Sequence, residues 1–153
     1  MRHFEPLESP NSQTMGTFFT AHFDETDWGM YPFISDQCAQ RKQGLSVMEN
    51  EEVVGSTLLV GNTWENERHT ARLVIIVRPL WRRKGIGRQL LQKAEELAGQ
   101  LDIWRLEVLL SVHDRASLLF FGTSGFQVEG IKRAAFSRSE EVVDGFYMAK
   151  ILK

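Results

Sequence analysis

One short stretch of the chain, RRKGIGR at residues 82–88, places four cations and two glycines directly before an amphipathic segment. The start of a helix presents unpaired backbone N–H groups and the positive end of the helix dipole, and this combination binds phosphate. Gly85 and Gly87 would let an anion approach the backbone, and the surrounding cations would add favourable charge. The stretch predicts an anion site, with an ordinary helix start and a solvated cationic surface as the alternative.

Two familiar phosphate-binding motifs are absent at this place. A Walker loop has Lys and then Ser or Thr at its last glycine, whereas Gly87 is followed here by Arg88 and Gln89. The dinucleotide-binding fingerprint needs a third small residue where this chain has Leu90. The anion site therefore belongs to another class.

The composition limits the classes of protein that this chain can represent. The 153 residues, 42% of them hydrophobic, suit a single domain over residues 1–153, in which residues 1–16 are expected to be irregular. A net charge of −2 gives no overall attraction to nucleic acid or to an anionic membrane, so we expect neither as a partner. The one cysteine excludes an intrachain disulfide, and no metal-ligand spacing is present. The longest apolar run, residues 73–77, is too short to cross a bilayer, and we expect a soluble, cytoplasmic protein.

Hydrophobic periodicity predicts the elements that would position the anion site. Residues 45–61 are typical of a strand, turn and strand, residues 70–79 of a central strand ending at Pro79, and residues 103–112 of a further buried strand. A helix is predicted over residues 85–99 with Gly99 as its C-cap, and a shorter helix over residues 113–125 with Asp114 as its N-cap. Residues 34–43 are a modest helix candidate ending at Gly44.

The chain is expected to finish with two antiparallel strands, over residues 126–137 and 141–152. The predicted order is β-β-β-α-β-α-β-β. This order indicates an α+β, or mixed α/β, fold with a helix on each face of the sheet.

Three motifs in order resemble one known family. VRPLWRRKGIGRQLL resembles the acyl-CoA pyrophosphate loop of the GCN5-related N-acetyltransferase (GNAT) family, whose signature is filled here by Arg82, Gly85 and Gly87. DRASLLFFGTSGF has the layout of a later family motif, which Gly125 and Phe126 match. The ending GFQVEGIKRAAFSRSEEVVDGFYMAKIL is similar to a subgroup of amino-acid, polyamine and ribosomal-protein-type acetyltransferases. The resemblance covers about residues 44–153.

The resemblance implies a GNAT fold, in which helices flank both faces of a central, mixed and mostly antiparallel twisted sheet. It also implies acetyl-CoA as co-substrate, no metal, and a homodimer as one expectation, because family members are often dimers. In the family, the strand before the loop lends backbone groups to the pantetheine arm. The cofactor-binding residues implied here are Ile75, Ile76, Val77, Arg82, Arg83, Lys84, Gly85, Ile86, Gly87, Arg88, Asp114 and Phe121.

The family's chemistry is direct attack of an amine on the thioester, and this chain departs from the usual proton-transfer groups. Phe121 falls where relatives have a tyrosine acid, and Asp114 falls where they have an asparagine. Phe121 has no proton to donate, and an ionised Asp114 can only accept hydrogen bonds. Asp114 is explained as well by a helix N-cap. On the strand before the loop, where relatives often carry a base, the inward positions hold Ala71 and Leu73, which do not titrate.

Other titratable residues remain as weak catalytic candidates, each with a structural alternative. The structural alternative, which is favoured in each case, is an outward or hydrogen-bonded strand residue for Glu107, a loop histidine for His113 and a packing residue of the last strand for Tyr147. Tyr31 is the other available phenol. The acidic group Asp24, Glu25 and Asp27 is a further candidate, or a solvated loop.

Two functions of different class follow. The first is an acetyl-CoA-dependent N-acetyltransferase acting on a small-molecule or protein primary amine, for which the acidic and aromatic segment with Trp28, Tyr31 and Phe33 favours a cationic acceptor. The alternative is a non-catalytic acyl-CoA-binding protein that has kept the fold and lost the usual acid and base. Nucleic-acid binding by residues 81–84 is a third reading, which the net charge disfavours.

Overall fold

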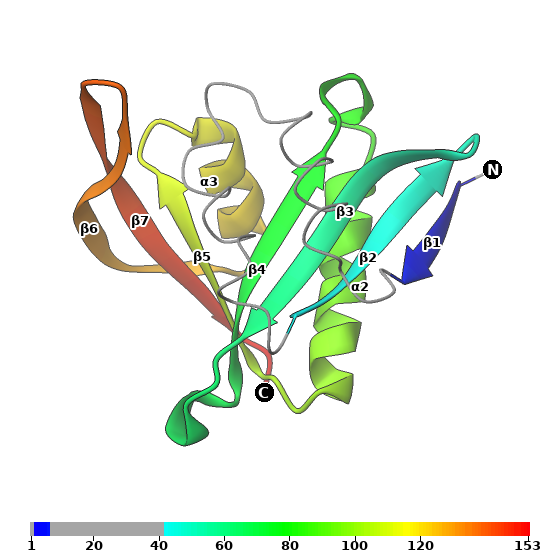
Figure 1. The fold of residues 1–153 in the computed structure, drawn as a ribbon, viewed down its shortest axis with the longest axis horizontal. Coiled ribbons are helices and arrows are strands. Elements are labelled where there is room, and N and C mark those ends of the chain that lie inside the picture. Colours follow the sequence, from blue (N-terminus) through cyan, green and yellow to red (C-terminus); the bar gives the residue numbers. More distant parts are fainter. Residues whose placement is uncertain (1, 7–41) are drawn as a thin grey trace.

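The protein is described here by a computed structural model, which covers residues 2–6 and 42–153 (Figure 1). One sheet of seven strands has the order β1-β2-β3-β4-β5-β7-β6. The strands are β1 (Arg2–Pro6), β2 (Lys42–Glu49), β3 (Glu52–Gly61), β4 (Thr70–Val77), β5 (Arg105–Ser111), β6 (Gln127–Arg138) and β7 (Glu141–Ile151). Every neighbouring pair is antiparallel except β4 and β5, which are parallel. The predicted α+β class and the mixed, mostly antiparallel sheet are confirmed.

The two parallel strands at the centre of the sheet separate after a short pairing. Residues 70–72 of β4 pair with residues 105–107 of β5, and beyond this point the strands diverge in a V (Figure 1). On its other side, β4 stays paired with β3 as far as Val77. The far half of β4 is therefore held firmly in the sheet while the side that would face β5 is open to another occupant.

Burial along β4 agrees with its predicted central position. Residues on both faces are covered: Ala71 and Leu73 on one face are 0% and 3% exposed, and Val74 and Ile76 on the other are each 3% exposed. A strand buried on both faces is expected to be a nearly continuous apolar run, as residues 73–77 are. The ladder ends before Pro79, where a short 3₁₀ turn (Pro79–Trp81) begins.

Helix α2 (Ile86–Gln100) follows the glycine-rich stretch and packs through one apolar stripe. Its buried residues are Ile86, Leu90, Leu91, Ala94 and Ala98, at the spacing predicted from the sequence. The prediction of Gly99 as C-cap is wrong, because the helix continues to Gln100. Asp102 adopts the left-handed conformation (φ 57°) instead, and the Ile103 N–H donates to the Ala98 carbonyl at 2.9 Å. This is a Schellman ending in which an aspartate takes the usual place of glycine.

Helix α3 (Arg115–Thr123) begins at the predicted N-cap, since the Asp114 carboxylate accepts a hydrogen bond from the Ser117 N–H at 3.1 Å. Side chains of α2 and α3 belong to the same hydrophobic cluster, together with Leu73 of β4 and Val108 of β5. Both helices therefore pack on one face of the sheet. The prediction of one helix on each face does not hold for these two.

The structure corrects two predictions near the start of the chain. Residues 2–6 form β1, which pairs with β2 and places Phe4 opposite Val47, so this part of the predicted irregular segment is a strand. Strand β2 begins at Lys42, which means that the last two residues of the predicted helix over 34–43 are extended. The rest of that helix, residues 34–41, lies outside the described residues.

The hairpin between β2 and β3 is confirmed, with a two-residue turn at Asn50 and Glu51. Both have positive φ, 53° and 64°, as the tight turn of a twisted hairpin requires. In the described part of the chain, no helix is long and apolar enough to cross a membrane.

Candidate functional site

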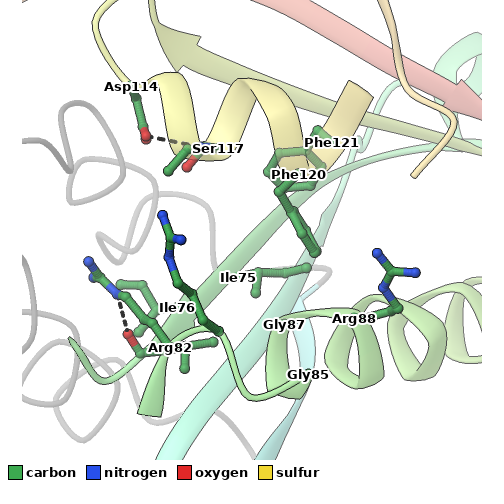
Figure 2. Close-up of a pocket in the computed structure, with 13 residues that line it drawn as sticks. Ile75, Ile76, Arg82, Gly85, Gly87, Arg88, Asp114, Ser117, Phe120 and Phe121 are labelled. Carbon is green, nitrogen blue, oxygen red and sulfur yellow. Dashed lines mark hydrogen bonds between the residues drawn. The ribbon is translucent and has the colours of Figure 1, made fainter. Parts of the chain in front are cut away.

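A cavity of about 450 Å³ lies where the V between β4 and β5 meets the starts of both helices. Figure 2 shows its two sides: Asp114 and Ser117 on the first turn of α3, and the loop with Arg82 and Gly85 leading into α2. The described residues that line it are Ile75, Ile76, Val77, Arg82, Arg83, Gly85, Gly87, Arg88, Asp114, Ala116, Ser117, Phe120 and Phe121. The cavity has an apolar floor, a cationic rim and one carboxylate.

Ten of the twelve residues proposed from the resemblance line this cavity. The two others do not. Ile86 is 1% exposed and packs with Val47, Val54 and Leu90, so its side chain anchors α2 to the sheet. The Lys84 ammonium lies 5.0 Å from the centre of the Trp81 ring, in a cation–π contact outside the cavity lining.

The glycines of the loop give the cavity its access to the backbone. Gly85 is the N-cap of α2 with φ 82°, a left-handed conformation that glycine adopts without strain, and a Cβ at this position would meet nothing within 4 Å. A Cβ on Gly87 would lie 3.5 Å from the Phe120 ring, an ordinary van der Waals contact, which shows how near α3 lies to the start of α2. The N–H groups of the first helical turn have no partner inside the helix and are available to an anion.

Three arginines surround this helix start. The Nε of Arg82 donates a hydrogen bond to the Val77 carbonyl oxygen at 3.0 Å, which joins the loop to the last residue of β4 (Figure 2). Arg83 has a positive φ of 61°, a conformation that costs a non-glycine residue about 1–2 kcal/mol. Strain of this kind is commonly found at binding sites. Together with Arg88, these side chains make the rim strongly positive.

The opposite wall of the cavity is a single face of α3. Ala116, Ser117, Phe120 and Phe121 line it, and their spacing of one and four residues puts them on one side of a helix. Of these four residues, only Phe121 was expected from the sequence. Helical spacing could have identified Ser117 as well, because a helix that presents residue 121 to a cavity also presents residue 117, one turn earlier.

Asp114 is the one carboxylate among the described residues that line the cavity. Its Oδ1 accepts the Ser117 N–H, so the chain itself provides a negative group at the start of α3. The start of α2 instead has three arginines and no acidic residue in its first turn, which makes it the more favourable place for a multiply charged anion.

The structure does not bring the three catalytic candidates to the cavity. Glu107 lies early in β5, opposite Arg72, and accepts a hydrogen bond from Arg105 at 3.0 Å. His113 is exposed after β5, with its N–H bonded to the Ser111 hydroxyl. Tyr147 lies on β7, opposite Leu109 of β5, and is 39% exposed. Some candidates lie outside the described residues. They are the acidic group at residues 24, 25 and 27 and the aromatic residues at 28, 31 and 33, which include Tyr31.

Glu107 belongs instead to an ion-pair network that joins strands. Arg105 of β5 contacts Glu107 through Nε and Glu129 of β6 through its terminal nitrogens, reaching across β7. The hydrogen bond from Arg105 holds the pKa of Glu129 below its usual value, and the bond to Glu129, followed by Glu107, raises the pKa of Arg105. This pairing gives Glu107 a structural role at the far end of β5 from the V.

We expect the Arg105–Glu129 pair to make stability depend on pH. A carboxyl whose pKa is lowered in the folded state stabilises the fold above its unfolded pKa, and this contribution disappears as pH falls through the folded pKa. Glu129→Gln should therefore lower the free energy of unfolding at pH 7 by less than about 1 kcal/mol, since the Glu129 side chain is 44% exposed. The difference from wild type should shrink below pH 4.5, the usual value for the group. Urea unfolding at pH 7 and pH 3.5 measures both effects.

The matched control is Glu51→Gln, which removes the same charge from an exposed hairpin turn. It should leave the pH dependence as in wild type. If the difference in free energy of unfolding between Glu129→Gln and wild type stayed constant from pH 7 to pH 3.5, the Arg105–Glu129 pair would not be the source of the pH dependence.

Comparisons with known proteins agree with this architecture. The fold matches that of the ribosomal-protein-S18-alanine N-acetyltransferase from Escherichia coli, with a TM-score of 0.79 and 19% identity. The match covers 100% of this chain and 95% of that protein's chain. YncA from Salmonella typhimurium, solved with its cofactor acetyl-CoA, matches over 100% of this chain and 95% of its own with a TM-score of 0.81 and 15% identity. At these identities the likeness shows the fold.

Sequence comparison gives the family. The L-amino acid N-acetyltransferase AaaT of Escherichia coli (strain K12) is 26% identical over 101 residues, which are 65% of this chain and 62% of that protein's length. The model of the acetyltransferase (GNAT) family matches residues 9–126, more than half of the chain. The chain therefore belongs to the acetyltransferase (GNAT) family.

Proposed function

We propose that this protein is an acetyl-CoA-dependent N-acetyltransferase that acetylates a primary amine. The observation that carries the proposal is the cavity at the V between β4 and β5, which joins an apolar channel to a glycine-containing helix start with three arginines. Such a site suits a ligand with a long, weakly polar arm and an anionic diphosphate. Membership of the GNAT family supports the same ligand.

Each part of acetyl-CoA has a suitable partner among the residues that line the cavity. The diphosphate would lie against the first N–H groups of α2, where Gly85 leaves open space and Arg83 and Arg88 supply charge. The pantetheine arm would run along Ile75, Ile76 and Val77, beside backbone groups of β4 on the side where β5 has diverged. Bound in this way, acetyl-CoA supplies an activated acetyl group as a thioester.

The reaction needs little from titrating side chains. A neutral amine attacks the thioester carbonyl, and holding the two reactants in line contributes about 7–11 kcal/mol to lowering the barrier. Backbone N–H groups of β4 near Ile76 and Val77 would polarise the carbonyl. The proton released by the amine can pass to water. This route accounts for a cavity whose one described titratable group apart from the arginines is Asp114.

For the acceptor we propose a small amine of the amino-acid type. The support is the name of the relative AaaT, an L-amino acid N-acetyltransferase, which aligns with 65% of this chain. A protein amine is the second candidate, because a structural neighbour is named as a ribosomal-protein-alanine acetyltransferase.

One observation favours a second function, that of a non-catalytic acyl-CoA-binding protein. Phe121, which stands where relatives have a tyrosine acid, is 3% exposed and packs edge-on against Phe126 at 5.0 Å between ring centres. A ring held in this way has a packing role, and it offers no proton to a leaving thiolate.

Two measurements on the same sample separate these functions. Calorimetric titration with CoA tests the site, and release of free thiol from acetyl-CoA across a panel of amino acids, polyamines and N-terminal peptides tests transfer. Binding with turnover on at least one amine supports the enzyme. Binding without turnover on any amine favours the binding protein, and no binding of CoA would contradict both.

A further inference from the structure

One polar side chain of the cavity has no role in the interactions described so far. Ser117 is the only hydroxyl-bearing residue among the described residues that line the cavity, and it lies on the first turn of α3 (Figure 2). Its backbone N–H bonds to Asp114, but within the described residues its hydroxyl group makes no hydrogen bond. The hydroxyl is therefore available to a ligand.

The position of Ser117 on α3 matters because of Phe121. The two residues are four apart and share the helix face that lines the cavity. Both side chains line the cavity, and of the two only Ser117 carries a donor.

We propose that the Ser117 hydroxyl donates a hydrogen bond to the sulfur of CoA as the C–S bond breaks, a role that rests on the acetyltransferase activity proposed above. In this step the amine nitrogen bonds to the acetyl carbon, the C–S bond breaks, and the electron pair goes to sulfur. The amine proton is released to water, and the product thiolate keeps its negative charge. Ser117 remains protonated and stabilises that charge without transferring its own proton.

The geometry explains why a serine can do this where a base or acid is lacking. A hydrogen bond to a charged acceptor is stronger than one to a neutral acceptor, so the bond gains strength as the thioester sulfur becomes a thiolate. An interaction that is stronger in the transition state than in the ground state raises kcat rather than affinity. The α2 arginines are suited to a diphosphate. On the wall that carries Ser117, Asp114 can only accept hydrogen bonds and already accepts the Ser117 N–H, so the Ser117 hydroxyl is the side-chain donor there for the sulfur.

The test is Ser117→Ala, which removes the hydroxyl and keeps the backbone bond to Asp114. We expect kcat for the best amine to fall about 10- to 100-fold, the range for losing a hydrogen bond to a charged group. The calorimetric Kd for CoA and the KM for acetyl-CoA should change less than about twofold, because the neutral thioester gains little from the bond. Alanine is a better helix former than serine, so α3 should remain intact.

Two further variants make the result specific. Ser117→Thr keeps a hydroxyl at the same carbon and should retain most of the kcat. Thr123→Ala removes a hydroxyl from α3 that bonds to the Leu119 carbonyl outside the cavity, and it should leave both kcat and Kd unchanged. Circular dichroism and thermal unfolding of each variant confirm that the fold is retained.

The outcomes separate this inference from the proposed function. Wild-type turnover together with an unchanged kcat in Ser117→Ala overturns the role of Ser117 and leaves the acetyltransferase intact. If Ser117→Ala raises the Kd for CoA and lowers kcat/KM by the same factor while kcat stays unchanged, Ser117 contacts CoA equally in the ground state and the transition state. That result also overturns the proposed role of Ser117. If wild type binds CoA and turns over no amine, the proposed function fails first, and the role of Ser117 fails with it.

Discussion

Replacing Gly85 by glutamate is expected to weaken CoA binding by about 100-fold or more while leaving the fold in place. The new carboxylate would stand at the start of α2, where the diphosphate is proposed to bind, and two like charges about 4 Å apart near a protein surface repel by roughly 4 kcal/mol. A Cβ at Gly85 meets no atom within 4 Å, so no clash with the core arises. The left-handed φ of 82° adds a strain of about 1–2 kcal/mol. Calorimetry with CoA and urea unfolding measure the two effects separately.

Two control variants isolate the charge from the backbone strain. Gly85→Ala carries the strain alone and should keep most of the affinity for CoA. Gly99→Glu adds the same charge at an exposed position in the last turn of α2, where a Cβ also meets nothing within 4 Å, and should bind CoA as wild type does. Normal binding by Gly85→Glu would show that the diphosphate is placed wrongly.

Replacing Gly55 by valine is expected to have the largest effect on stability. A Cβ there would lie 3.1 Å from the Ile76 carbonyl oxygen and 3.1 Å from methyl carbons of Ile86 and Leu90. The carbonyl is fixed in the β3–β4 pairing, and the two side chains are 1% and 0% exposed, so none of them can move aside cheaply. Overpacking of this kind costs about 1–3 kcal/mol. Because α2 must shift away from β3, CoA binding should weaken as well.

The matched control is Gly130→Val, another strand glycine, where a Cβ meets nothing within 4 Å. Its free energy of unfolding should equal or exceed that of wild type, since valine favours strands. Urea unfolding at one pH compares the three proteins. Equal stability of Gly55→Val and wild type would show that the close approach of α2 and β3 is not rigid.

The loop at residues 82–88 could be predicted from the sequence because the residues that make it suitable for an anion are consecutive in the chain. Gly85 and Gly87 with the neighbouring arginines specify a helix start open to an anion, and no distant contact is needed to recognise it. The strand before the loop was predictable for a similar reason, since an apolar run ending at Pro79 leaves few alternatives. The structure brings ten of the twelve proposed residues to one cavity. Their contact with CoA stays a prediction.

Other features depend on contacts that the sequence does not reveal. Strand β1 has only Phe4 as an inward apolar residue, and its place is set by pairing with β2. The end of α2 was misplaced because Asp102 adopts a conformation in which glycine is the usual expectation. Glu107 is titratable and lies on the expected strand, yet Arg105 binds it and the strands separate only after its position. The deciding partner is remote in the chain only for β1, whereas at the end of α2 and at Glu107 it is a near neighbour whose conformation or contact the hydrophobic pattern does not show.

The early separation of β4 and β5 has a consequence for how the protein can evolve. In the middle of a closed ladder every peptide group is committed to a neighbour, but the far half of β4 keeps one row of peptide groups facing a cavity. Peptide groups are the same for every amino acid except proline, so mutation to any other residue leaves that row of donors and acceptors unchanged. A ligand recognised through it can be retained while the surrounding residues diverge. Neighbours with the same fold share as little as 14–19% of their residues with this chain.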